Sequence, residues 1–184
     1  MKKYFWIILF LFVAGCMACA HTGGLSKPAS YSFSIDIPAG WRKIDNNQYL
    51  LATKENPFLQ YIMVQNRPIS RSFRNTKKKI QKKMLPEEAA QIIIDELISD
   101  QNLVNLRVIN NTPATLKGYE GFKLLYTYSD SEGQTYKTLY YGFLKEDTFF
   151  NLRFTAEGQV HFQRDIGDFR SILNTFQIFK NETA

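Results

Sequence analysis

The stretch GYEGFKLLYTYSDSEGQTYKTLYYGFLKEDTFFNLRFTAE, Gly118 to Glu157, contains three runs in which apolar and polar side chains alternate. The runs cover residues 121–128, 134–144 and 149–156, and alternation with a period of two predicts β-strands. The breaks between them, SDSEG and KED, have the length of hairpin turns, and Gly133 can adopt the positive φ that such turns require. This stretch therefore predicts three antiparallel strands joined by two hairpins.

Further strands are expected on both sides of these hairpins. Residues 31–37 alternate, with Phe33, Ile35 and Ile37 on one side and polar residues on the other. Trp41 follows at a position where a large ring can cover the end of a core. Other short strands are expected at 48–53, 58–66 and 103–110, the last of them ending at the break Asn110–Pro113.

Two segments change to helical spacing. Pro86 suits a first helical turn, and Glu87 and Glu88 suit the positive end of the helix dipole, so a helix is predicted over about 85–99. Its apolar stripe consists of Ala90, Ile93, Ile94, Leu97 and Ile98. A second stripe predicts a C-terminal helix and consists of Phe162, Ile166, Phe169, Leu173 and Phe176. Each stripe requires a sheet face to cover it.

The order strands, helix, strands, helix, without long parallel crossovers, predicts the α+β class. We expect a mainly antiparallel sheet with helices packed on its faces. The chain has 184 residues and is 45% apolar, which is enough for one sizeable core and too little for two comfortable domains. A single domain is therefore expected over 31–180, behind a leader.

Three segments carry a resemblance to a known family. The stretches YSFSIDIPAGW (31–41), the hairpin stretch 118–157 and FRSILNTFQI (169–178) resemble the Mog1/PsbP-like domains, which include bacterial lipoproteins without assigned activity. The resemblance covers nearly all of 31–179 and implies an α/β/α sandwich. Members named for a function bind other proteins, a Ran-type GTPase or the lumenal face of photosystem II. The resemblance thus implies docking without bond-making.

The first residues predict export. A basic start, KKY, precedes the apolar run FWIILFLFVA and then small residues, the pattern of a signal peptide. Val13-Ala14-Gly15-Cys16 resembles the bacterial lipobox, so we expect a signal peptide over 1–15 and lipidation of Cys16. Cleavage after Ala20 at an A-x-A site is the alternative. An uncut span is disfavoured, because the apolar stretch is shorter than the roughly 20 residues that cross a bilayer.

The expected lipid anchor determines the expected location and partners. Acyl chains on Cys16 would hold the protein in a membrane, and residues 16–30, rich in small residues, would form a flexible tether. Met17 stands where some Gram-negative lipoproteins carry an inner-membrane retention Asp, so the periplasmic face of the outer membrane is expected. Export excludes nucleic acid as a partner despite the pI near 9.2.

One segment concentrates the positive charge. No acidic residue lies between Glu55 and Glu87, while eight basic residues do. These are Arg67, Arg71, Arg74, Lys77, Lys78, Lys79, Lys82 and Lys83. The segment can bind an acidic partner, with Phe73, Ile80 and Met84 as a narrow apolar edge if it is helical. The favoured interpretation is a solvated, partly mobile loop, since charge runs commonly lie on exposed surface.

Tyrosines crowd the central hairpin. Tyr126, Tyr128, Tyr136 and Tyr140, with Tyr141 beside them, could line a groove for a glycan or peptide. Strands are enriched in aromatic residues in any case, so cross-strand packing beneath a helix is the favoured explanation. The groove remains the basis of an alternative function, a periplasmic carrier or sensor for a small ligand.

Catalysis finds no support in the sequence. Both cysteines, Cys16 and Cys19, precede the domain, and no serine has an assignable base partner. Glu157, His161 and Asp165 share a spacing of four, but three residues on one stripe of one helix cannot surround a metal ion. We therefore expect no cofactor, no metal and no enzyme activity. The predicted function is that of a lipid-anchored envelope protein that binds or assists the assembly of another envelope protein.

Overall fold

The computed structural model describes residues 32–45 and 48–179, and the expected signal peptide (1–15), Cys16 and tether (16–30) lie outside them. The main element is a seven-stranded antiparallel sheet with the order β2-β3-β4-β8-β7-β6-β5. Its strands are β2 (Arg42–Asp45), β3 (Leu50–Thr53), β4 (Gln60–Pro68), β5 (Val104–Leu116), β6 (Tyr119–Ser129), β7 (Thr135–Lys145) and β8 (Thr148–Glu157).

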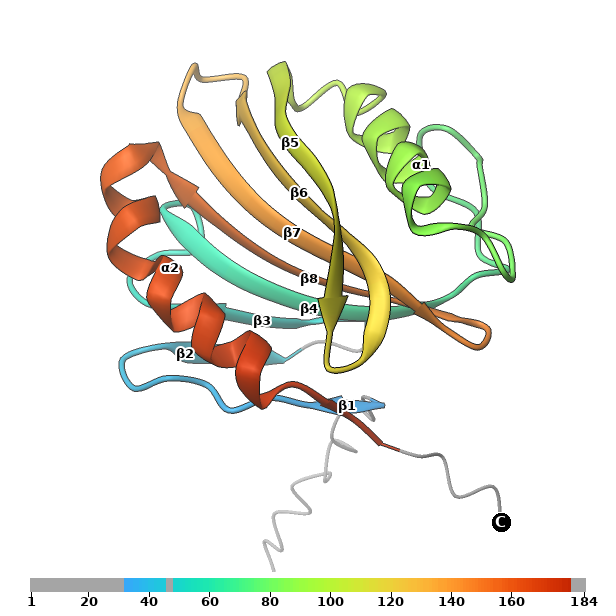
Figure 1. Ribbon diagram of the computed structural model, residues 1–184. Helices are drawn as coiled ribbons and strands as arrows, with labels where there is room; N and C mark the ends of the chain where they lie inside the picture. Colours follow the sequence, from blue (N-terminus) through green and yellow to red (C-terminus); the bar gives the residue numbers. More distant parts are fainter. Residues whose placement is uncertain (1–31, 46–47, 180–184) are drawn as a thin grey trace, which may run out of the picture.

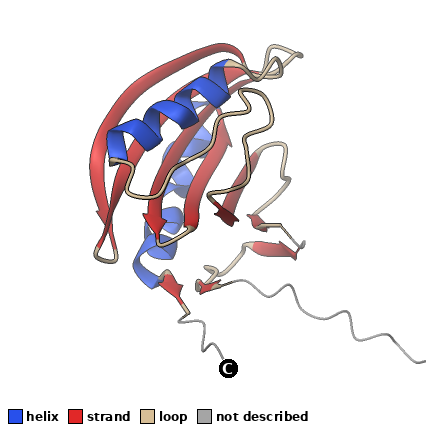
Figure 2. Cartoon of the chain, turned by 90° about the vertical axis from the view of Figure 1, so that its right-hand side faces the viewer, coloured by secondary structure: helices blue, strands red, loops and turns tan. Residues whose placement is uncertain are grey.

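Two helices cover opposite faces of this sheet. Helix α1 (Pro86–Ile98) packs over β5, β6 and β7, and helix α2 (Gly158–Thr175) packs over β8, β7 and β4 (Figure 1). When the α1 side faces the viewer, one helix crosses in front of the sheet and the other lies behind it (Figure 2). A short pair of strands, β1 (Phe33–Ser34) and β9 (Gln177–Ile178), joins the two ends of the domain. The expected α+β class with an α/β/α arrangement is confirmed.

The hairpins form as the alternation predicts. Strands β6, β7 and β8 are consecutive neighbours, and Gly133 in the first turn has φ +85°. Glycines also let aromatic rings lie flat on the sheet. A Cβ on Gly142 would lie 2.5 Å from Cζ of Phe122 and 2.9 Å from Cζ of Phe149. Since real Cβ atoms do not approach so closely, glycine is required here for the rings to pack.

The core has two parts, one on each face. On the α2 side, alternate residues of β8 meet the stripe of α2, and the largest of these buried side chains are Phe150, Phe154, Phe162, Phe169 and Phe176. On the α1 side, Phe122, Tyr140 and Phe149 meet Ala90 and Ile93 of α1. Trp41 closes the α2-side core, with an exposed fraction of 8%, as expected.

Several predicted boundaries are wrong. The expected strand 31–37 is paired only at Phe33–Ser34, and β2 lies where no strand was expected. Strand β5 does not end at Asn110 but continues to Leu116, after a register shift between Val108 and Asn110. Pro113 is tolerated there because β5 is an edge strand, where one side of the backbone has no partner to lose. Within 32–45 and 48–179, neither helix has the length and apolar content to cross a bilayer.

Candidate functional site

The basic segment is a loop that leads from β4 to α1, and it is packed against the domain. Phe73 and Ile80 are buried in the α1-side core, with exposed fractions of 8% and 3%. Glu96 of α1 accepts hydrogen bonds at 2.9 Å from the backbone N–H groups of Asn75 and Thr76, and from the Thr76 hydroxyl. The segment is therefore a loop, which was the favoured interpretation. It does not lie free in solvent, because Phe73, Ile80 and the carboxylate of Glu96 anchor it to the domain.

Arg67 at the end of β4 organises the first turn of this loop. Its Nη2 donates to the carbonyls of Arg71 (2.7 Å) and Ser72 (3.0 Å), and its guanidinium lies 4.0 Å from the centre of the Phe73 ring. Burial, followed by repulsion from Arg71, lowers the pKa of Arg67 from its usual value, although arginine remains charged at neutral pH. Arg67 thus holds a fixed positive charge beneath the loop.

Four basic residues surround one hollow, which we call the loop pocket. It has a volume of about 360 Å³ and is lined by Gln48, Gln65, Arg67, Arg71, Ser72, Phe73, Arg74 and Lys77. None of these lining residues is acidic, and Glu96, which accepts hydrogen bonds from the loop backbone and attracts Arg67, is not among them. Arg71, Arg74 and Lys77 are exposed and can reach a ligand. The chemistry of this site suits carboxylate or phosphate groups.

The backbone of the loop pocket is strained at one lysine. Lys77 has φ 60°, a left-handed conformation that costs a residue with a Cβ on the order of 1 kcal/mol. Its Nζ donates to the carbonyl of Arg74 at 2.7 Å, which holds the side chain over the same turn. Strain of this kind concentrates at binding sites, where the surrounding packing maintains it.

The other four predicted patch residues lie outside the loop pocket. Lys78 forms an ion pair with Asp95 of α1 at 2.5 Å, and it lowers the pKa of that carboxyl by hydrogen bonding to it. Lys82 forms an ion pair with Asp147 at 3.0 Å, and both side chains are more than 60% exposed. Lys79 and Lys83 are exposed. The predicted patch of eight residues therefore divides into four that share one pocket and four that do not.

The predicted tyrosine groove is only partly open. Tyr126 and Tyr140 have exposed fractions of 2% and 4% and belong to the α1-side core. Tyr128 and Tyr136 are a cross-strand pair with ring centres 5.2 Å apart, and both remain partly exposed. The Tyr136 hydroxyl donates to Asp130 at 3.2 Å. Tyr141 points to the other face, toward Phe169.

Sequence reasoning missed one residue on this face, Arg153 of β8. It lies directly opposite Met63 of β4 and Tyr140 of β7 in the sheet register. Its guanidinium carbon lies 5.8 Å from the centre of the Tyr61 ring. The available signal was that Arg153 is the single charged residue in the run FFNLRFTA.

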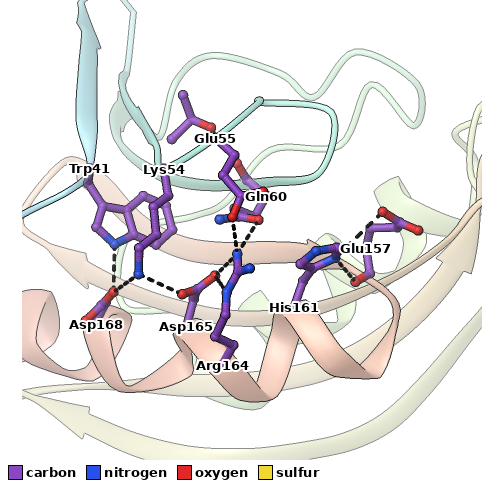
Figure 3. Close-up of polar contacts among 10 residues, drawn as sticks. Trp41, Lys54, Glu55, Gln60, Glu157, His161, Arg164, Asp165 and Asp168 are labelled. Carbon is purple, nitrogen blue, oxygen red and sulfur yellow. Dashed lines mark hydrogen bonds and ion pairs between the residues drawn. The ribbon is translucent and has the colours of Figure 1, made fainter.

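A separate polar cluster joins α2 to the turn after β3, and Figure 3 shows its side chains. Asp165 is fully buried and accepts from Lys54 Nζ at 3.0 Å and from Arg164 Nη2 at 2.8 Å. Arg164 also meets Glu55 at 2.9 Å. Burial alone would raise the pKa of Asp165, but the hydrogen bonds and charges of Arg164 and Lys54 outweigh burial, so the pKa lies below its usual range.

The contacts of this polar cluster connect separate parts of the fold. Trp41 Nε1 donates to Asp168 Oδ2 at 2.8 Å, which ties the start of the domain to the same helix. His161 Nδ1 lies 3.7 Å from Glu157, the residue that precedes α2, and no hydrogen bond or ion pair joins either of them to Asp165 (Figure 3). In the part of the chain that the structure describes, no three His, Cys, Asp or Glu side chains are grouped as metal ligands would be.

Comparisons with protein-family models and with curated protein sequences found no match. Solved structures do match. CyanoP, the PsbP of Synechocystis, has a TM-score of 0.57 at 10% identity, over 80% of this chain and 87% of CyanoP. The Ran-binding protein Mog1p of Saccharomyces cerevisiae has a TM-score of 0.54 at 10% identity, over 80% of this chain and 90% of Mog1p.

A third similar structure comes from a bacterial envelope protein. LpqN of Mycobacterium tuberculosis, which is involved in cell envelope biogenesis, has a TM-score of 0.52 at 15% identity, over 85% of this chain and 88% of LpqN. At these identities the likeness establishes the fold. The chain has the Mog1/PsbP-like fold, as the sequence resemblance implied.

Proposed function

We propose that this protein is a non-catalytic docking domain, held at the cell envelope by lipidated Cys16, that binds an acidic face of another envelope protein through the loop pocket. The observation that carries the proposal is the group of four basic side chains around one hollow, with no acidic residue among its described lining residues. Like charges so placed repel one another until a partner supplies negative charge, so the pocket favours an anionic surface.

The similar structures support docking as a use of this fold. Mog1p is a Ran-binding protein, and LpqN is involved in cell envelope biogenesis. Both descriptions fit an accessory that acts by contact with another macromolecule. A nuclear GTPase is not available to an exported protein, so the proposed partner is an acidic protein face within the envelope.

The proposed anchor increases the strength of docking. Two or more acyl chains give stable membrane attachment, at about 0.8 kcal/mol for each buried methylene. A domain confined to a surface meets partners on that surface at a high effective concentration, so a weak contact becomes sufficient.

Intact-mass analysis of the protein from its native cells tests the anchor. We expect a chain that begins at Cys16 and carries the added mass of a diacylglycerol and an N-acyl group. Replacing the thiol, Cys16→Ser, should abolish the added mass and release the protein from membranes. A native chain that begins at His21 without fatty mass would contradict lipidation and leave the loop pocket to act without an anchor.

Neutralising the exposed part of the loop pocket tests docking. The variant Arg71→Gln, Arg74→Gln, Lys77→Gln should lower the affinity for the envelope partner by about tenfold or more, since three charge pairs are lost. Raising the salt concentration should weaken wild-type binding in the same direction, because the screening length falls to roughly 3 Å at 1 M. Binding is measured by co-purification from envelopes and then with the purified partner.

The matched control removes the same charge elsewhere. The variant Lys79→Gln, Lys83→Gln, Arg107→Gln loses three exposed basic residues, none of which lines the loop pocket. It should retain most of the affinity. An equal loss of affinity in both variants would show that net charge alone determines binding. If the triple variant of the loop pocket co-purifies the partner as well as the wild type does, the loop pocket is not the docking site.

A further inference from the structure

Arg153 is a cation on the sheet that pairs with no acidic side chain in the described part of the chain. It lies on β8 and faces the α1 side, with Tyr61 of β4 and Tyr126, Tyr128 and Tyr140 of β6 and β7 around it. Among the described residues no carboxylate forms an ion pair with it, and Nη2 donates to the sulfur of Met63 at 3.1 Å, a weak acceptor. The guanidinium also forms a hydrogen bond with the uncharged hydroxyl of Tyr126. Within 32–45 and 48–179 the buried Nε of Arg153 has no hydrogen-bond partner. A desolvated cation left in this way lowers the stability of the fold.

The hydroxyls around Arg153 do not supply a negative charge. Burial raises the pKa of Tyr126 to about 12, and it raises the pKa of Tyr128 and Tyr140 as well. These tyrosines therefore remain protonated at neutral pH. The cluster has a surplus of donors, namely the guanidinium N–H groups and the phenolic hydroxyls, and a shortage of anionic acceptors.

Solvent reaches this part of the sheet. Helix α1 packs over β5, β6 and β7, whereas Arg153 and Tyr61 lie on β8 and β4, the next two strands beyond it. Arg153, Tyr61 and Tyr128 are each partly exposed. These three residues can therefore be approached from solvent without displacement of the helix.

We propose that Arg153 and the tyrosines around it form a second binding site, separate from the loop pocket, for the oxyanion group of a small aromatic or otherwise flat molecule. A carboxylate or a phosphate ester would accept two parallel hydrogen bonds from the guanidinium. The flat remainder of the molecule would stack on the exposed faces of Tyr61 and Tyr128. The site lies on the face that could serve a carrier or sensor, so it goes beyond the proposed docking function.

Simple probes can test the site in the full-length chain in detergent. Benzoate and phenyl phosphate carry the two candidate oxyanions, and benzamide is the uncharged analogue of benzoate. We expect saturable binding of at least one anion by calorimetry, with shifts of the Tyr61 and Tyr128 ring signals in NMR spectra. Benzamide should bind at least about tenfold more weakly, because it lacks the charge-assisted hydrogen bonds. If only benzoate binds, the ligand carries a carboxylate. If only phenyl phosphate binds, the ligand is a phosphate ester.

Two variants distinguish a binding role from a structural role. Arg153→Met should weaken anion binding at least about tenfold while the melting temperature of the ligand-free protein stays equal or rises, because an uncompensated charge is replaced by an apolar chain. Arg153→Lys should retain the charge but lose the paired hydrogen bonds and give intermediate affinity. The Arg71, Arg74, Lys77 triple variant should bind the probes as the wild type does.

Three outcomes would overturn the proposal. The first is that the wild type binds neither anion. The second is that Arg153→Met and Arg153→Lys both bind as tightly as the wild type. The third is that both variants lower the melting temperature of the ligand-free protein and leave probe affinity unchanged in the fraction that folds, which would make Arg153 structural. None of these outcomes affects the loop pocket, because docking is measured with different residues.

Discussion

Phe154→Ala should lower the free energy of unfolding by about 3–5 kcal/mol, the cost of a large cavity in a packed core. Phe154 on β8 is fully buried. Its ring lies 5.4 Å from that of Phe162 and 6.0 Å from that of Phe169, both on α2, and 6.2 Å from that of Trp41. The ring therefore connects the sheet, the C-terminal helix and the start of the domain. Domains of this size are stable by about 5–15 kcal/mol, so the loss is a large fraction of the total.

Equilibrium unfolding in urea measures this loss, and a surface phenylalanine provides the control. Phe58 is 77% exposed, so Phe58→Ala should change the free energy of unfolding by less than about 0.5 kcal/mol. A loss below about 1 kcal/mol for Phe154→Ala would mean that the α2-side core is not organised around this ring.

Asp165→Asn should lower the free energy of unfolding by about 2 kcal/mol at pH 7, the worth of charge-assisted hydrogen bonds to a buried group. The fully buried carboxylate of Asp165 is bonded to Lys54 and Arg164, and the neutral amide cannot balance those two cations. The control is Glu55→Gln at the exposed outer end of the same network, where the side chain is 48% exposed. That change should cost no more than about 0.5 kcal/mol.

The same variant predicts a pH dependence. The pKa of Asp165 is lower in the folded protein than its usual value, which is about 3.9 in an unfolded chain. The unfolded chain therefore takes up the proton first as the pH falls, so the stabilisation by Asp165 is complete above about pH 5 and is lost progressively as the pH falls through the unfolded pKa toward the lower folded pKa. The difference in unfolding free energy between wild type and Asp165→Asn should shrink from pH 5 to pH 3, when both are followed by urea unfolding. A difference that stays constant over this range would contradict the ion-pair account.

The fold was largely predictable where its contacts are local. Alternation in 121–156 predicted β6, β7 and β8 because neighbouring strands of a meander need only a period of two and a turn. The stripe of Phe162 to Phe176 predicted α2 because the helical spacing of three and four is also a local pattern. Strand β2 (RKID) was missed because Arg42, Lys43 and Ile44 are all exposed and so show no alternation of buried and exposed side chains. The continuation of β5 through Pro113 depends on its edge position, which only the complete sheet defines.

The sequence predicted which residue types contribute to the candidate sites, but it did not predict how those residues are arranged. The charge run identified all four basic residues of the loop pocket, but it did not separate them from the four basic residues outside it. That separation depends on the position of Phe73 and Gln65 in the pocket lining and on the Lys78–Asp95 ion pair, which form only in the folded chain. The tyrosine pattern placed Tyr128 and Tyr136 on the same hairpin, but Arg153 comes from another strand and completes the cluster only in the folded sheet. The Lys54–Asp165 pair joins residues too far apart in the chain for any local pattern to indicate.

Site-specific photo-crosslinking in the native envelope tests the docking function most directly. A photoreactive amino acid at Ser72, which lines the loop pocket, should capture one envelope protein whose contact surface is acidic, and the capture should fail when Arg71, Arg74 and Lys77 are neutralised. The same group at exposed Ser171 on α2, on the opposite face of the sheet, should not capture that protein. Equal products from both positions, or capture that survives neutralisation, would contradict docking through the loop pocket.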